Sequence, residues 1–152
     1  MMIRSAAPAD MPALFDLEAQ TYGSEAYPSL FLHQALLQWP DLLYVACNEQ
    51  NEILGYALFA PAAPKVNTPN SAWLMSLLVS PQARGQGVGK ALTTFGLQHL
   101  VEQGIVQCML TVAPDNASAI QLYQKLGFNT EVTIAHALGH NEHRLLLKWQ
   151  HA

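Results

Sequence analysis

The sequence has little charge, little cysteine and no long uninterrupted apolar run. Only 12% of its 152 residues are charged and 51% are hydrophobic, which excludes a disordered chain and indicates a compact core. The net charge of −4 argues against a nucleic-acid partner. Gly55, Pro61 and Pro64 interrupt the most apolar stretch well short of the ~18 residues that a membrane span needs. We therefore expect neither a nucleic-acid-binding protein nor a membrane protein.

The only two cysteines are Cys47 and Cys108, and each lies in an apolar, strand-like run. Such a pattern predicts buried, reduced thiols, because a disulfide framework or a metal site needs more cysteines or nearby histidines. The first ten residues, MMIRSAAPAD, contain no long apolar segment, so no secretory signal is expected. Together these features favour a cytoplasmic protein.

The length and the order of periodic segments predict one mixed α/β domain over residues 1–152. Short apolar runs bounded by Gly, Pro or Asn predict strands, and apolar positions spaced i, i+3, i+4 predict helices. The expected strands are 2–6, 42–48, 53–60, 73–80, 106–112, 132–137 and 143–149. The helices begin after Asp10, which is expected to cap the first, at Pro28 or Ser29, after the glycines at 85–89, and at Asn116. The run 73–80 is almost continuously apolar and is expected to be covered on both faces.

The segment QARGQGVGKAL, residues 82–92, resembles a phosphate-binding loop but matches neither common type. A P-loop needs glycine where Arg84 stands and serine or threonine where Ala91 stands. A dinucleotide fingerprint beginning at Gly85 needs glycine in place of Lys90. Both types are therefore excluded.

The physical requirements for an anion site are nevertheless present in this loop. Gly85, Gly87 and Gly89 connect a strand to a helix, so backbone N–H groups can converge at a helix N-terminus without interference from Cβ atoms. Arg84 and Lys90 add positive charge beside these donors. We predict that this loop binds phosphate groups.

Two segments resemble motifs of the GNAT family of N-acetyltransferases. LLVSPQARGQGVGKAL, with RGQGVG at 84–89, is similar to the family's motif A, and NASAIQLYQKLGF, at 116–128, is similar to its motif B. The resemblance covers residues 74–128, and the order of strands and helices on both sides agrees with it. It implies a mostly antiparallel sheet, with a central pair of parallel strands that splay apart and helices on its faces. It also implies an acetyltransferase that uses acetyl-CoA and no metal.

The resemblance assigns roles to particular residues. Backbone groups of three strand residues are expected to pair with the pantetheine arm, and the loop is expected to hold the pyrophosphate. Asn116 and Ser118 correspond to positions that contact the cofactor, although either can instead cap the helix. Tyr123 corresponds to the family's general acid, although its helical spacing also fits a core aromatic. The implied cofactor residues are Leu77, Leu78, Val79, Arg84, Gly85, Gln86, Gly87, Val88, Gly89, Lys90, Asn116 and Ser118.

A general base is missing from the two central strands. Thr111 stands where enzymes that acetylate ribosomal-protein N-termini often have Glu, and Trp73 and Met75 stand where arylalkylamine acetyltransferases have His. A water chain that ends on Glu18, Glu25 or a histidine of the tail remains open as the proton acceptor.

The acceptor is expected to bind the segment TYGSEAYPSLFL, residues 21–32, through Tyr22, Glu25 and Tyr27. Residues 1–60 contain seven acids and one base, a net charge of −6, whereas residues 61–152 carry a net +2. An aromatic, acidic segment suits a cationic amine with an apolar body. The favoured function is therefore transfer of acetyl to a small cationic or aralkyl primary amine. A protein N-terminal or lysine acetyltransferase and a non-catalytic acetyl-CoA-binding module remain alternatives.

The C-terminal segment carries three histidines and an apolar last strand. His136, His140 and His143 are expected to be scattered by strand alternation, so no metal site is predicted there. The last expected strand, 143–149, is apolar enough to form a homodimer interface or to be an internal strand, and the sequence leaves both open.

Overall fold

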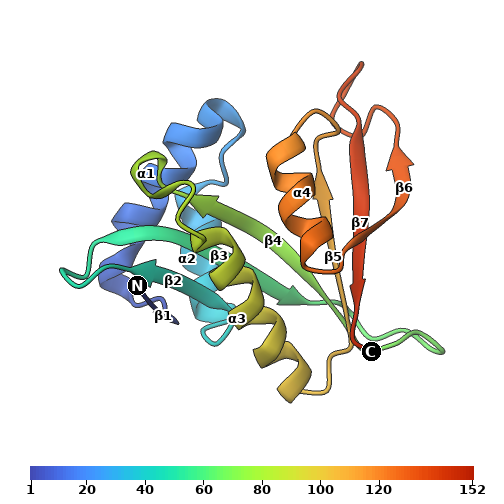
Figure 1. Ribbon diagram of the computed structural model, residues 1–152, viewed down its shortest axis with the longest axis horizontal. Helices are drawn as coiled ribbons and strands as arrows, with labels where there is room; N and C mark the ends of the chain where they lie inside the picture. The colour runs from blue at the N-terminus through green and yellow to red at the C-terminus, as the bar shows by residue number, and fades with distance from the viewer. The chain divides into compact units, whose positions relative to one another are not determined.

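A computed structural model describes residues 1–152, which form two compact units (Figure 1). Unit 1 comprises Met1–Ala60 and Met75–Gly96, and unit 2 comprises Pro61–Leu74 and Leu97–Ala152. The strands are β1 (Met2–Ser5), β2 (Leu43–Cys47), β3 (Ile53–Pro61), β4 (Ser71–Val79), β5 (Gln107–Val112), β6 (Asn129–Ile134) and β7 (Arg144–Gln150). The helices are α1 (Met11–Tyr22), α2 (Ser29–Gln38), α3 (Val88–Glu102) and α4 (Ala117–Lys125), with short 3-10 turns η1 (Pro8–Asp10), η2 (Gly23–Glu25) and η3 (Pro81–Ala83).

The seven strands follow the order β1-β2-β3-β4-β5-β7-β6 in one sheet. β4 and β5 are parallel, in register from Ser71↔Gln107 to Trp73↔Met109. The pairs β1–β2, β2–β3, β5–β7 and β6–β7 are antiparallel. This topology confirms the expected mixed α/β fold with a mostly antiparallel sheet and one parallel pair.

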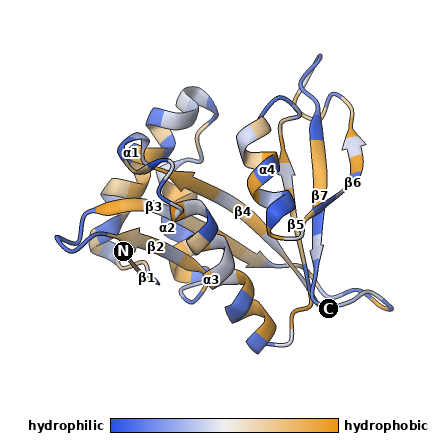
Figure 2. Cartoon of the chain, viewed as in Figure 1, coloured by the Kyte–Doolittle hydropathy of each residue, from blue (hydrophilic) through white to orange (hydrophobic).

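Unit 1 has its core between the strands and the first two helices. Leu14 of α1 and Leu32 of α2 are fully buried against Val45 of β2 and Leu58 of β3. Figure 2 shows β2 and β3 as largely hydrophobic and the turn between them as hydrophilic. In that turn Asn48 accepts the N–H groups of two later residues through its Oδ1, as expected for an Asn-initiated hairpin.

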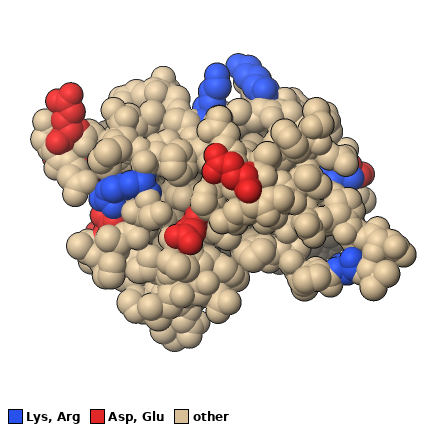
Figure 3. All heavy atoms as spheres, turned by 90° about the horizontal axis from the view of Figure 1, so that it is seen from below, with Lys and Arg blue, Asp and Glu red and all other residues tan.

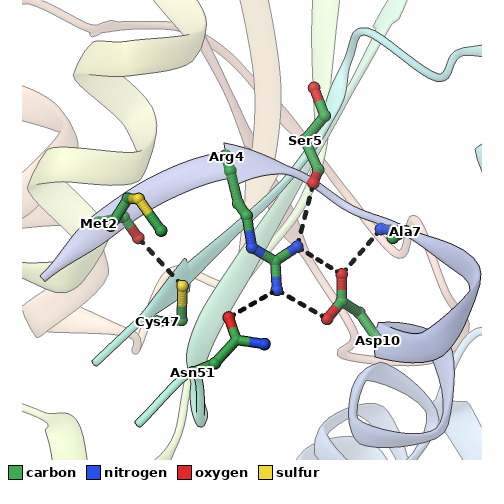
Figure 4. Close-up of polar contacts among 7 residues, drawn as sticks. All are labelled: Met2, Arg4, Ser5, Ala7, Asp10, Cys47 and Asn51. Carbon is green, nitrogen blue, oxygen red and sulfur yellow. Dashed lines mark hydrogen bonds and ion pairs between the residues drawn. The ribbon is translucent and has the colours of Figure 1, made fainter. Parts of the chain in front are cut away.

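An ion pair fixes the N-terminal corner of unit 1 (Figure 4). The guanidinium of Arg4 donates to both carboxylate oxygens of Asp10, at 2.7 and 2.9 Å, and to Oδ1 of Asn51 at 3.0 Å. Asp10 occupies the N-cap position of α1, as expected, but its side chain makes no capping hydrogen bond to that helix. Asp10 instead accepts the N–H of Ala7 at 2.7 Å, so it holds the chain between β1 and η1.

Unit 2 contains β5, β6, β7 and α4. β7 is an internal strand that pairs with β5 on one side and with β6 on the other. β6 begins at Asn129, three residues before the expected start, and all its residues are exposed. Of the two readings of the last strand, the structure thus supports the internal one.

The turn between β6 and β7 brings its histidines together, contrary to expectation. The ring of His136 lies 4.7 Å from that of His143 and is stacked on that of His140 at 5.6 Å, measured between centroids. β6 ends at Ile134, so strand alternation does not apply at 136–143. Two of the rings accept backbone N–H groups through Nδ1, His143 from His136 and His136 from Asn141.

Three further predictions from the sequence can be compared with the structure. Both cysteines are free and buried, as predicted. β4 is not covered on both faces, because buried and half-buried residues alternate along it. No helix is both long enough and apolar enough to cross a membrane.

Candidate active site

The glycine-rich loop joins β4 to α3 in unit 1. Gly85 and Gly87 both have φ of 79°, in the left-handed region that favours glycine. A Cβ added at either position would meet no heavy atom within 4 Å, so the outer side of the loop is open. The N–H of Ala91 donates to the carbonyl of Gly87 at 3.0 Å, and the N–H groups before it have no partner within the helix. The loop therefore presents free donors and the positive end of a helix dipole.

The polar and apolar side chains of the loop face different ways. Arg84, Gln86 and Lys90 are exposed, whereas Val88 is buried and anchors the start of α3. Thr93, one turn into the helix, is buried and donates to the carbonyl of Gly89 at 2.8 Å. A fixed helix start with exposed cations is suited to binding a phosphate group.

Gly55 of β3 is a residue of this region that sequence reasoning missed. A Cβ at this position would lie 2.6 Å from the carbonyl oxygen of Leu78, 3.3 Å from Cα of Val79 and 3.2 Å from Cγ1 of Val88. No side chain fits there, so β3 runs directly against the backbone that is expected to carry the pantetheine arm. The signal in the sequence is a single glycine inside an apolar strand run.

The expected acceptor segment, residues 21–32, runs from the end of α1 through η2 into the start of α2, also in unit 1. Tyr22 and Glu25 are exposed and Tyr27 is half-buried. The hydroxyl of Tyr27 donates to the carbonyl of Met75 on β4 at 2.9 Å, and its ring packs on Phe31 of α2 at 4.8 Å between centroids. The pKa of Tyr27 is raised above its ordinary value, first by burial and then by the negative charge of Glu18. The structure thus ties this segment to the strand that precedes the glycine loop.

Glu18 of α1 is buried, with only 1% of its surface exposed, and it contacts the acceptor segment through Tyr27. Its Oε1 accepts hydrogen bonds from the hydroxyls of Tyr56 on β3 and Ser76 on β4. Its Oε2 accepts the N–H of Tyr27 at 3.2 Å. Burial, and then the bond to Glu18, raise the pKa of Tyr56 above its ordinary range. Of the candidate bases, Glu25 is exposed and Glu18 is enclosed.

The remaining site residues lie on α4 of unit 2. Oδ1 of Asn116 accepts the N–H of Ala119 at 3.3 Å and the hydroxyl of Ser118 at 3.4 Å. Asn116 is therefore the helix cap that the sequence allowed, and its contact with a cofactor remains a prediction. Tyr123 is buried, and its ring lies 5.6 Å from that of Phe128. This position is compatible with a core aromatic and with the predicted acid.

No group of three or more His, Cys, Asp or Glu side chains is arranged to hold a metal ion. The free N–H donors and exposed cations of the glycine loop are suited to an anion, and the exposed Glu25 is suited to a cationic group.

Solved structures share the fold over almost the whole chain. A chain of a NatC complex bound to Gag peptide and CoA is 19% identical, with a TM-score of 0.90 over 99% of this chain and 98% of that one. Ribosomal-protein-alanine N-acetyltransferase from Brucella melitensis is 24% identical, with a TM-score of 0.84 over 99% of both chains. At this level of identity the likeness concerns the fold.

Relatives in sequence match a shorter part of the chain. A mycothiol acetyltransferase of Paenarthrobacter aurescens is 39% identical over 89 residues, which are 59% of this chain and 28% of that protein. The mycothiol acetyltransferase of Saccharomonospora viridis is 52% identical over 62 residues, 40% of this chain and 20% of that protein. The chain thus spans less than a third of the length of these curated relatives.

The sequence profile of the acetyltransferase (GNAT) family matches residues 11–128, which include the glycine loop, the acceptor segment and α4. The chain belongs to the GNAT family of acetyltransferases, which use acetyl-CoA as co-substrate.

Proposed function

We propose that this protein transfers the acetyl group of acetyl-CoA to the primary amine of a small cationic or aralkyl molecule. The observation that carries the proposal is the loop between β4 and α3, where Gly85 and Gly87 hold left-handed conformations beside open space. Such a loop at a helix start suits the pyrophosphate of acetyl-CoA. The proposed contacts are the backbone of Leu77, Leu78 and Val79 and the residues Arg84 to Lys90, with Asn116 and Ser118 on α4.

We assign the role of general acid to Tyr123. In the reaction the amine nitrogen attacks the thioester carbonyl, the C–S bond breaks, and the CoA sulfur takes a proton while the nitrogen loses one. A buried tyrosine hydroxyl can donate the proton or a hydrogen bond to the departing sulfur. The proton lost by the amine passes to water, since no acidic or histidine side chain lies on β4 or β5.

The acceptor class rests on two observations. The acceptor segment carries Tyr22, Glu25 and Tyr27, and it lies in the part of the chain, residues 1–60, whose net charge is −6. The curated relatives described above are named for mycothiol, which favours a small molecule over a protein as the acceptor.

The Tyr123→Phe variant tests the assignment of the acid. We expect turnover to fall by about 100-fold, the lower end of the effect of a general acid, while the affinity for acetyl-CoA is unchanged. CoA release measured with arylalkylamines, polyamines, amino acids and short peptides gives turnover, and calorimetry gives the affinity.

Tyr44→Phe is the control, because Tyr44 is also buried and donates its hydroxyl to a backbone carbonyl. Normal turnover by Tyr123→Phe would contradict the role of this hydroxyl. Turnover with peptides alone would favour a protein acceptor, and binding of acetyl-CoA without any turnover would favour a binding module.

A further inference from the structure

The buried carboxylate of Glu18 anchors the acceptor segment to the sheet of unit 1. Glu18 receives hydrogen bonds from three different parts of unit 1: Tyr56 of β3, Ser76 of β4 and the backbone N–H of Tyr27. The hydroxyls of Tyr56 and Ser76 also lie 3.0 Å apart. The oxygens of Glu18 thus link the helix before the segment, the segment itself and two strands of the sheet.

This carboxylate has no cation beside it. The ion pairs of the chain join Arg4 to Asp10, Arg144 to Glu142 and Lys148 to Glu131, and Glu18 is buried with hydroxyl and N–H donors alone. Burying an acidic side chain without a counter-ion costs free energy unless its hydrogen bonds are complete. An apolar residue at position 18 would fill the core at a lower cost in free energy. The reason for a carboxylate here is therefore its hydrogen bonds to the three groups.

Tyr27 is hydrogen-bonded both to Glu18 and to β4, so it links the two. Its N–H is bound to Oε2 of Glu18, and its hydroxyl donates to the carbonyl of Met75, two residues before the strand segment proposed to bind the pantetheine arm. Between these two bonds, the ring packs on that of Phe31 in a tilted arrangement. Backbone and side chain of Tyr27 are therefore both fixed relative to β4.

We infer that Glu18 and Tyr27 form a clamp that sets the position of the acceptor segment on β4 and thereby the affinity for the acceptor amine. This inference rests on the proposed function, because it takes the acceptor segment, residues 21–32, as the part of the chain that binds the amine. Glu18 is a positioning residue, since it acts through Tyr27 and is enclosed away from solvent.

The Tyr27→Phe variant tests the clamp with little disturbance of packing. It removes the hydroxyl bond to Met75 and keeps both the N–H bond to Glu18 and the ring contact with Phe31. We expect the KM for the acceptor amine to rise by about tenfold, the effect of one hydrogen bond, with the KM for acetyl-CoA unchanged. Hydrogen exchange of the amides at 23–28 should become faster.

Tyr44→Phe is the matched control, since it also removes a tyrosine hydroxyl that donates to a backbone carbonyl in unit 1. It should change neither the KM values nor exchange at 23–28. If Tyr27 has only a structural role, its substitution lowers the fraction of active enzyme. The apparent kcat then falls, and both KM values stay unchanged. That result for Tyr27→Phe, with unchanged exchange at 23–28, would overturn the inference.

Glu18→Gln provides a second variant, because glutamine keeps one carbonyl oxygen and cannot accept at both positions. We expect a larger rise in the acceptor KM than for Tyr27→Phe. If Glu18→Gln does not fold, Tyr27→Phe alone decides. A wild-type protein that binds acetyl-CoA but turns over no amine would instead refute the proposed function and, with it, this inference.

Discussion

The pair of Arg4 and Asp10 shows how one charged contact organises a chain with few charges. Asp10 is buried and accepts from a guanidinium and from the N–H of Ala7. These bonds hold the pKa of its carboxyl below the ordinary value, the bond from Arg4 having the larger effect. The same bond raises the pKa of Arg4, which stays charged throughout the accessible range.

We expect this pair to make stability depend on pH in the acid range. The pKa of Asp10 is lower in the folded state, so its stabilisation is complete above the unfolded pKa and is lost as pH falls through the folded one. Asp10→Asn should therefore lower the free energy of unfolding at pH 7 by about 1–3 kcal/mol. The difference in the free energy of unfolding between this variant and wild type should become smaller below about pH 4. Urea unfolding of both proteins at several pH values measures this difference.

Asp16→Asn is the control for this series, because Asp16 is exposed on α1. A difference between Asp10→Asn and wild type that stays constant down to pH 3 would show that the carboxylate charge is not what stabilises the corner. Asp10 lies at the N-cap position that the sequence predicted, but its side chain makes no capping hydrogen bond, for a local reason. Arg4 lies six residues earlier and competes for the same oxygens, and no helix-start pattern encodes that.

At the scale of single elements, the loop before α3 depends on backbone conformation more than on side chains. Gly87 and Gly104 offer a comparison, because their φ values are 79° and 82° and neither has an atom within 4 Å of an added Cβ. Alanine at either site should cost about 1–2 kcal/mol of stability. Only Gly87→Ala should also weaken acetyl-CoA binding, because only there does the backbone carry the proposed phosphate donors. Calorimetry with both variants measures the difference.

Equal affinity in the two alanine variants would mean that the loop does not bind the cofactor through its N–H groups. Equal loss of affinity in both would point to a general effect of lowered stability. The sequence predicted the place of this loop between a strand and a helix, since three alternating glycines follow an apolar run, and its binding of phosphate groups stays a prediction. It did not predict Gly55, whose role depends on the approach of a neighbouring strand.

The contact between α3 and β3 sets how closely the helix lies on the sheet within unit 1. A Cβ on Gly96 would overlap the ring of Phe59, whose side chain is fully buried. Gly96→Ala should therefore cost about 1–3 kcal/mol through overpacking. Adding Phe59→Leu makes room, so the double variant should lose less than the sum of the two single losses. Denaturant unfolding of wild type, Gly96→Ala, Phe59→Leu and the double variant gives the four free energies of this double-mutant cycle.

Additive losses in that cycle would show that the two side chains do not compete for the same space. Here the sequence was informative only in part. It predicted the helix from its periodicity, but a glycine inside a helix gives no indication of which aromatic ring lies against it.

At the scale of the whole molecule, charge is sparse and hydrophobic patterning dominates. Figure 3 shows wide areas of one face without charged side chains, as 12% charged residues imply. The pattern predicted every helix and strand, with boundary errors of a few residues. It failed in the turn 135–143, because histidines in a turn have no periodicity from which their positions follow. It also left Ser76 and Tyr56 unassigned, because their partner Glu18 is distant in sequence.

The two thiols report on the two units separately. Cys47 is buried in unit 1 and Cys108 in unit 2, and burial raises the pKa of the Cys108 thiol to about 12. Neither should react with a disulfide reagent at pH 8 until its surroundings open, and both should react at once in denaturant. Labelling rates of Cys47→Ala and Cys108→Ala measure each thiol alone. Rapid labelling of the native protein would contradict the burial of that cysteine.

The three hydrogen bonds to Glu18 also limit how the acceptor range proposed for this protein can change, in evolution or by design. A library that varies only the surface residues of the acceptor segment keeps the hydrogen bonds to Glu18, and its members are expected to differ in what they recognise while the segment stays in place. A library that varies position 18 alone leaves the backbone N–H of Tyr27 and at least one of the two hydroxyls without their acceptor, and most of its members are expected to be inactive or unfolded. Positions 18, 27, 56 and 76 are expected to change as a group, so a new acceptor specificity that moves the segment requires compensating substitutions on both strands.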